Sequence, residues 1–176
     1  MGEWIKGGLR ITRAALDAVE RDARRGFDAD EEACGYVRGP ATDALLCDEA
    51  VSMPNLANKL HSIDPETYFR TGRSFFAFNE KKFDDAVRRG DREGRPIKVL
   101  YHSHVEAGAY FSATDRAVMS MGEPPNEEGG ACVLGPGPAW PLAFLVVSVR
   151  RSGVDDHKLF VWDGHDFAES TFEIVD

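Results

Sequence analysis

The sequence has few cysteines, and they do not form a clustered pair. Cys34, Cys47 and Cys132 are the only three in 176 residues, and no C-x-x-C motif occurs. An odd number of cysteines without such a motif argues against a disulfide framework and against a structural zinc site. A cysteine protease built on Cys132 is an alternative, but the preceding Gly129–Ala131 is not a recognisable nucleophile motif.

Basic residues and long apolar stretches are also scarce. The chain has 21 Lys and Arg against 30 Asp and Glu, a net charge of -9 at pH 7, which disfavours binding to nucleic acid or to an anionic membrane. No stretch has the length of a membrane-spanning helix. The start, Met1–Lys6, lacks the apolar segment of a signal peptide and the Ser or Thr of a myristoylation site. We therefore expect a cytoplasmic protein without a nucleic-acid or membrane partner.

Length and composition indicate one compact unit. With 176 residues, of which 43% are hydrophobic, the chain can bury one substantial core, and we expect a single domain over residues 1–176. Helical and strand patterns alternate irregularly along the chain. This favours an α/β fold of the α+β type, with a curved mixed β-sheet flanked by helices, over a doubly wound fold.

Three segments have the periodicity or start signals of helices: Ile11–Arg25, a segment following Asp64-Pro65, and Glu80–Arg89. Thr12 is a suitable cap for the first helix. Gly26 and Gly90 are typical of the residue that follows a helix, so we expect the first and third helices to end there.

Six segments have strand patterns: Ala33–Arg38, Leu45–Met53, Pro96–Tyr101, Leu142–Val149, Lys158–Trp162 and Phe172–Val175. Between them, Gly122–Pro141 contains ten Gly or Pro in twenty residues, which predicts a long loop. Such a loop is either a substrate lid or partner-binding insertion, with Trp140 as an anchor, or an ordinary connection, and the sequence favours neither.

The segment His102-Ser103-His104 follows the predicted strand Pro96–Tyr101 directly. Side chains at positions i and i+2 of a strand leave the same face, so both imidazoles can converge on one point. Ser112 and Asp115 open a helical segment that can return Asp115 to the histidines. Two nitrogens and one carboxylate oxygen leave a tetrahedral zinc ion one position short, and a catalytic zinc keeps that position for water.

Each part of this pattern also has a simpler explanation. Ser112-x-x-Asp115 is close to a capping box, and two histidines on a strand can face solvent by chance. An acid elsewhere changes the balance, because zinc chemistry needs a base that takes a proton from water. Glu32, beside Glu31, precedes a short predicted strand and is suited to that role.

Together these motifs resemble the JAMM/MPN metallopeptidases. That family combines an upstream Glu, an H-[ST]-H segment and S-x-x-D, which match here Glu32-Ala33-Cys34-Gly35, His102-Ser103-His104, and Ser112 with Asp115. The resemblance covers roughly Leu9 to Val175. The chain departs from the family at Val105, where proline is usual.

The resemblance implies a role for each residue. His102, His104 and Asp115 would bind Zn²⁺, Glu32 would be the general base, and Ser112 would stabilise the oxyanion. It also implies a zinc-dependent peptidase or isopeptidase that cuts after the C-terminal Gly-Gly tail of a ubiquitin-like or sulfur-carrier protein. An E1-like adenylating enzyme would act in the same pathway.

Two other functions are alternatives to this one. A catalytically inactive MPN scaffold would share the fold, but such scaffolds tend to have lost a ligand, and this chain retains all of them. A zinc deaminase also pairs a metal with a glutamate, but it needs a P-C-x-x-C ligand pair that this sequence lacks.

Overall fold

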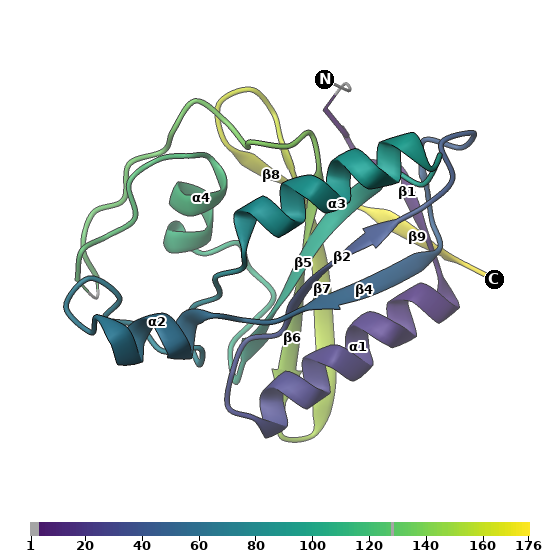
Figure 1. Cartoon of the computed structure of the whole chain (residues 1–176). Helices are drawn as coiled ribbons and strands as arrows, with labels where there is room; N and C mark the ends of the chain where they lie inside the picture. Colours follow the sequence, from purple (N-terminus) through teal and green to yellow (C-terminus); the bar gives the residue numbers. More distant parts are fainter. Residues whose placement is uncertain (1–3, 128) are drawn as a thin grey trace.

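The computed structural model describes residues 4–127 and 129–176, which form nine strands and four helices (Figure 1). In chain order these are β1 Leu9–Thr12, α1 Arg13–Asp28, β2 Cys34–Arg38, β3 Leu46–Cys47, β4 Glu49–Met53, α2 Ala57–Ile63, α3 Glu80–Arg92, β5 Ile97–Val105, α4 Ala113–Met119, β6 Ala143–Arg150, β7 Gly153–Trp162, β8 Phe167–Ser170 and β9 Phe172–Val175.

Six of the strands form one mixed sheet in the order β4-β2-β5-β6-β7-β8. Strands β5 and β6 are parallel, and the other neighbours in this sheet are antiparallel. A smaller parallel sheet has the order β3-β1-β9. The predicted α/β architecture with a mixed sheet and flanking helices is therefore confirmed.

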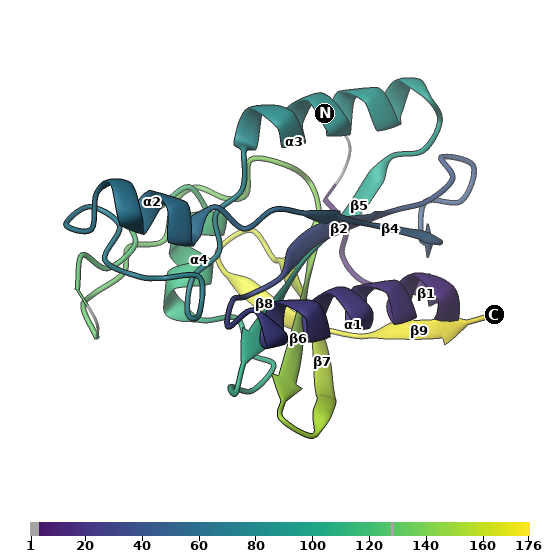
Figure 2. The ribbon, with the colours of Figure 1, turned by 60° about the horizontal axis from the view of Figure 1, so that its bottom comes forward.

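Helices α1 and α3 cover opposite faces of the large sheet (Figure 2). Leu16 of α1 belongs to one buried cluster, together with Val99 and Tyr101 of β5. Phe83 of α3 belongs to a second cluster, which contains Leu100. Because side chains alternate along a strand, His102 and His104 leave β5 on the same face as Leu100, away from α1.

The ends of two helices differ from the prediction. Thr12 does cap α1, since its hydroxyl oxygen accepts from the Ala15 N–H at 3.2 Å, but Leu9–Thr12 is a strand. Gly26 and Gly90 do not end their helices and lie buried within them. A Cβ at Gly26 would lie 2.7 Å from a backbone oxygen of Glu31, and one at Gly90 would lie 2.5 Å from that of Arg95. Each glycine therefore allows the following chain to cross close to its helix.

Other boundaries also needed correction. The prediction of a helix after Asp64-Pro65 is wrong, because α2 ends at Ile63. The residues that follow form a turn, in which the Asp64 carboxylate accepts from the Thr67 N–H. The single strand expected over Leu45–Met53 is divided at Asp48 into β3 and β4, which belong to different sheets. Strand β7 begins earlier than predicted, and β8 was not predicted.

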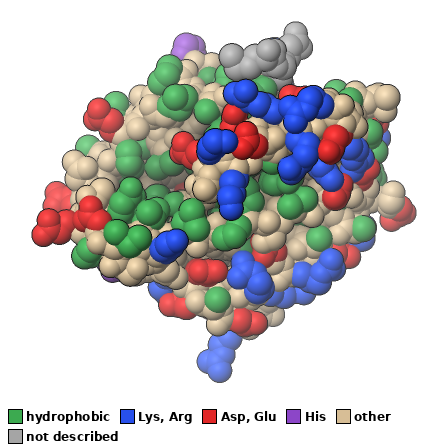
Figure 3. Space-filling model, in the orientation of Figure 1, with side chains coloured by type: hydrophobic (Ala, Val, Ile, Leu, Met, Phe, Trp, Pro, Cys, Tyr) green, Lys and Arg blue, Asp and Glu red, His purple; other side chains and the backbone are tan. Residues whose placement is uncertain are grey.

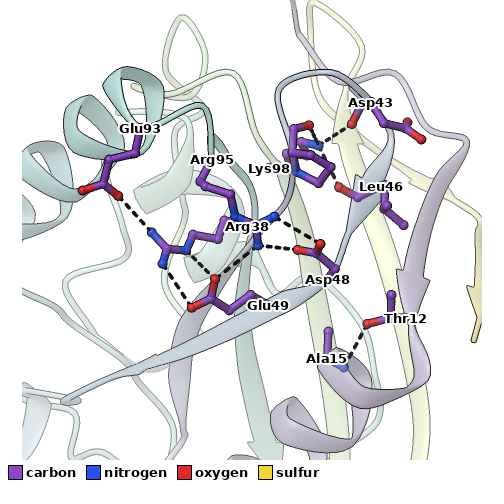
Figure 4. A network of polar contacts seen from close by, with 11 residues as sticks. Thr12, Ala15, Arg38, Asp43, Leu46, Asp48, Glu49, Glu93, Arg95 and Lys98 are labelled. Carbon is purple, nitrogen blue, oxygen red and sulfur yellow. Dashed lines mark hydrogen bonds and ion pairs between the residues drawn. The ribbon is translucent and has the colours of Figure 1, made fainter.

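A polar network holds the beginning of β5 (Figure 4). Lys98 is 3% exposed, and its Nζ donates to the carbonyl oxygens of Pro40, Asp43 and Leu46 at 2.9, 2.6 and 2.7 Å. Nearby, the guanidinium of Arg95 pairs with the carboxylate of Asp48. These contacts fix the strand that carries both histidines further along.

Charged side chains of both signs are interspersed on the face shown in Figure 3, mostly over α3 and α1. Hydrophobic side chains gather on the same face near α2 and α4. The excess of acidic residues is therefore not concentrated in one patch on this face.

Candidate metal centre

His102, His104 and Asp115 converge at the end of β5 and the start of α4. Nε2 of His102 lies 3.2 Å from Nε2 of His104 and 3.2 Å from Oδ2 of Asp115. Nε2 of His104 lies 3.4 Å from the same oxygen. The three residues are only 2%, 4% and 6% exposed, so their ligand atoms form a small buried triangle.

The size of this triangle fits a zinc ion. Bonds of 2.0–2.1 Å in a tetrahedral arrangement place neighbouring ligand atoms ~3.3–3.4 Å apart. The three observed separations, 3.2, 3.2 and 3.4 Å, agree with that spacing. Two imidazoles and one carboxylate are also ligands that zinc accepts, and they leave a fourth position for water.

Neighbouring groups orient both imidazole rings. Nδ1 of His104 lies 2.8 Å from the carbonyl oxygen of Gly108, to which it donates, so the neutral ring carries its lone pair on Nε2. The ring of His102 stacks on Phe76 with centroids 4.4 Å apart. The Nε2 atoms of both histidines therefore face Asp115.

The Asp115 carboxylate completes the capping box of α4 and also faces the histidines. The Ser112 hydroxyl oxygen accepts from the Asp115 N–H at 3.0 Å, and the Ser112 N–H donates to Oδ2 of Asp115 at 2.9 Å. The simpler explanation, a capping box, is therefore correct. It does not compete with a metal site, because Oδ2 also lies against His102. The Ser112 hydroxyl accepts in the cap and keeps its own proton for donation.

Glu32 lies in the loop before β2 and is 5% exposed. Its N–H donates to the Gly72 carbonyl at 2.6 Å, and its carbonyl oxygen accepts from the Asn55 side chain at 2.9 Å. Together with His104 and Ser112 it lines a cleft of about 550 Å³. The Glu31 carboxylate instead pairs with Arg25 at 3.3 Å.

The electrostatics of the centre differ from residue to residue. Burial, reinforced by the charge of Asp115, raises the pKa of Glu32 well above its usual value. Burial also acts to raise the pKa of Asp115, but the imidazoles of His102 and His104 outweigh it and hold that pKa below its usual range. Burial lowers the pKa of His102 and favours the neutral ring, the form that binds metal.

Several residues at the site were not predicted. Phe76, Gly108 and Asn55 orient the predicted residues, and Arg70 and Thr114 line the same cleft. A stacking aromatic ring or an orienting carbonyl leaves no local sequence signal. Arg70 lies in an aromatic-rich stretch for which no helix or strand was predicted.

Residues 122–127 and 129–141 form the predicted loop, and residue 128 lies outside the described residues. That Trp140 anchors a substrate or partner stays a prediction. The ring of Trp140 packs edge-on against Phe83 at 4.7 Å, and its Nε1 donates to Asp84 at 3.3 Å. Trp140 therefore packs within the fold. Nearer the tip, Pro125, Gly129 and Gly130 line the cleft.

Comparison with known families decides the relationship. The family described as prokaryotic homologs of the JAB domain matches residues 12–158. The chain belongs to this family. The resemblance to JAMM/MPN proteins that the motifs predicted is thereby confirmed. A comparison of this JAB-domain chain with curated proteins found no match.

Solved structures show the same fold as this JAB-domain protein. A protein from Desulfitobacterium hafniense superposes with a TM-score of 0.61 at 19% identity, covering 96% of this chain and 95% of that one. A JAB1/MPN domain protein from Archaeoglobus fulgidus gives 0.51 at 14% identity, covering 96% and 100%. A protein from Salinibacter ruber gives 0.52 at 20% identity, covering 96% and 92%.

The helices of this JAB-domain protein are short or polar. Across the described residues, 4–127 and 129–176, none is long and apolar enough to cross a membrane.

Proposed function

We propose that this JAB-domain protein is a zinc-dependent peptidase or isopeptidase. Its substrate would be the amide bond that follows the C-terminal Gly-Gly tail of a ubiquitin-like or sulfur-carrier protein. The observation that carries the proposal is the buried triangle of His102, His104 and Asp115, whose separations suit zinc. Glu32, the buried acid that the reaction needs, lines the cleft together with His104.

Each residue has a part in the proposed hydrolysis. His102, His104 and Asp115 would hold Zn²⁺, which when bound polarises a carbonyl group and lowers the pKa of water to about 7. Glu32 would take a proton from the attacking water and pass it to the departing amine nitrogen. Its raised pKa makes this carboxyl a stronger base than an ordinary glutamate, as the first half of that transfer requires. The Ser112 hydroxyl would donate to the oxyanion, because its cap contact uses it only as an acceptor.

The proposed substrate follows from family membership and from chemistry. A glycine tail has no side chains, so it can approach a buried centre in an extended form. Such carriers are activated at the same C-terminus, so an E1-like adenylating enzyme is the second partner that we propose.

Two neighbouring acids provide the test. We would measure zinc content and cleavage of a carrier with an amide-linked group after its Gly-Gly tail, for the wild type, Glu32→Gln and Glu31→Gln. We expect about one zinc per chain in all three, since neither acid is among the three ligands. Cleavage should be lost in Glu32→Gln and retained in Glu31→Gln, whose side chain pairs with Arg25 instead.

Two other results would count against the proposal. Equal cleavage by Glu32→Gln and the wild type would overturn the role of Glu32. Absence of zinc from the wild type would overturn the proposal and favour the inactive scaffold.

A further inference from the structure

Arg70 is a half-buried cation in the cleft beside the metal centre. It lies between α2 and α3, in the segment 69–74 that lines one side of the cleft. Its guanidinium donates to the hydroxyl oxygen of Thr114 and lies over the ring of Phe69, 5.1 Å from the centroid. The guanidinium is therefore held in place before any substrate arrives.

Arg70 differs from the other half-buried arginines in its partners. Each of those pairs with a carboxylate; they are Arg10, Arg38, Arg95, Arg116 and Arg150. Among residues 4–127 and 129–176, no carboxylate lies within the 4.0 Å ion-pair distance of Arg70. A guanidinium has five N–H donors, so the Thr114 contact leaves donors available for an anion in the cleft.

The position of Arg70 limits where that anion can lie. Arg70 and Thr114 line the same cleft as Glu32 and His104, and Thr114 directly precedes Asp115. The Thr114 contact thus holds the guanidinium in the cleft in which the bond would be cut. In a substrate, the α-carboxylate of an amino acid attached to the tail lies one residue beyond the bond to be cut. A lysine side chain joined through its amine offers only methylene groups there.

Resting on the proposed function, we propose that Arg70 binds the terminal α-carboxylate of the amino acid that is released. The substrate is then a carrier tail extended by one amino acid, and not an isopeptide to a lysine side chain. The planar guanidinium suits this role because it can hold both oxygens of a carboxylate at once. Arg70 is thus a residue that determines substrate class, outside the reacting set.

A binding experiment tests this without requiring turnover. Glu32→Gln protein loaded with zinc would be titrated by NMR with a short peptide ending in Gly-Gly-alanine, as the free acid and as the C-terminal amide. We expect about tenfold tighter binding of the acid, which corresponds to one charge-assisted contact. When Arg70→Gln is added to Glu32→Gln, the ratio of the two affinities should fall to about one. Arg70→Lys should give an intermediate ratio, because lysine keeps the charge but lacks the planar group that holds both carboxylate oxygens.

Arg73 provides a matched control. It lines the same cleft, but its guanidinium already pairs with Asp30, so Arg73→Gln should preserve the preference for the acid. Equal binding of the two peptides, binding of neither, or a preference that survives Arg70→Gln would overturn the assignment. A preserved preference without cleavage by protein that retains Glu32 would instead count against the proposed hydrolysis, so the two failures are distinguishable.

Discussion

The Asn55 side chain binds the backbone of the candidate base, Glu32. Its Nδ2 donates to the Glu32 carbonyl oxygen at 2.9 Å and to the Phe75 carbonyl oxygen at 3.0 Å. Its Oδ1 accepts from the N–H groups of Ala57 and Ala77 at 3.0 and 3.1 Å. One side chain thereby joins the loop before β2 to the start of α2 and to the segment that carries Phe76.

Replacement of Asn55 should therefore affect stability and reaction together. We expect Asn55→Ala to lower the free energy of unfolding by about 1–3 kcal/mol, the usual cost of unsatisfied polar groups. It should also lower kcat with little loss of zinc, because the contacts of Asn55 are to the backbone of Glu32 and not to the ligands. Urea unfolding, zinc content and peptide cleavage would be measured side by side. Wild-type kcat in a destabilised Asn55→Ala would contradict a positioning role.

The two roles of Ser112, helix N-cap and proposed oxyanion donor, can be tested separately. Ser112→Ala should lose about 0.5–2 kcal/mol of stability as a helix N-cap. If the hydroxyl also stabilises the oxyanion, kcat should fall about 10²–10³-fold. Thr12→Ala is the matched control, because Thr12 caps α1 at a distance from the cleft and should cost similar stability with unchanged kcat. Similar kcat values in the two variants would remove Ser112 from the reaction.

Thiol reactivity should separate the three cysteines. Cys34 and Cys47 are fully buried, and burial raises the pKa of each thiol to about 12, so almost no thiolate forms at pH 8. Cys132 is half-exposed. We expect one thiol to react rapidly with a disulfide reagent in the native protein, three after unfolding, and none rapidly in native Cys132→Ser. A second fast thiol in the native protein would contradict the packing around β2 or β3.

The acid stability of the fold should depend on Arg95. Its hydrogen bonds hold the pKa of Asp48 below the ordinary value of 3.8, and Arg38, with Arg95, does the same for Glu49 below 4.5. A carboxyl whose pKa is lowered by folding stabilises the protein above its unfolded pKa and loses that contribution as the pH falls through the folded pKa. We therefore expect Arg95→Gln to cost up to about 1 kcal/mol at pH 7, since these groups are partly exposed, and less near pH 3.

Urea unfolding at both pH values measures this difference. Lys81→Gln is the control, because its pair with Asp85 is largely exposed and should contribute little at either pH. If Arg95→Gln lowered the free energy of unfolding equally at pH 3 and pH 7, the loss would come from packing and not from charge.

The fold was predictable where the local sequence pattern and the tertiary contacts agree. The amphipathic α1 and α3 and the apolar β5 and β6 were found because their periodicity is strong. Predictions of helix ends failed at Gly26 and Gly90, because these glycines allow the chain that follows each helix to cross close to it. The division at Asp48 likewise depends on tertiary pairing, since β3 pairs with β1 and β4 pairs with β2, which no local pattern contains.

The candidate site was also predictable only in part. The convergence of His102 and His104 follows from strand alternation, and the return of Asp115 follows from the cap that begins α4. Which of the two adjacent acids faces the cleft could not be derived from spacing, because Glu32 lies in a loop and not on a strand. The contacts of Asn55, Phe76 and Arg70 depend on how separate segments pack, so no local sequence pattern indicates them.

Helix α4 is only seven residues long, and helices of that length are marginal without outside support. Its first turn is closed by the Asp115 carboxylate, the group that also lies against both histidines. A cation held by that carboxylate would favour the arrangement in which the first turn is closed, so occupancy and helix order become thermodynamically linked. Amide hydrogen exchange in Ala113–Met119 should then slow on loading with zinc, so this short helix would report whether the centre is filled.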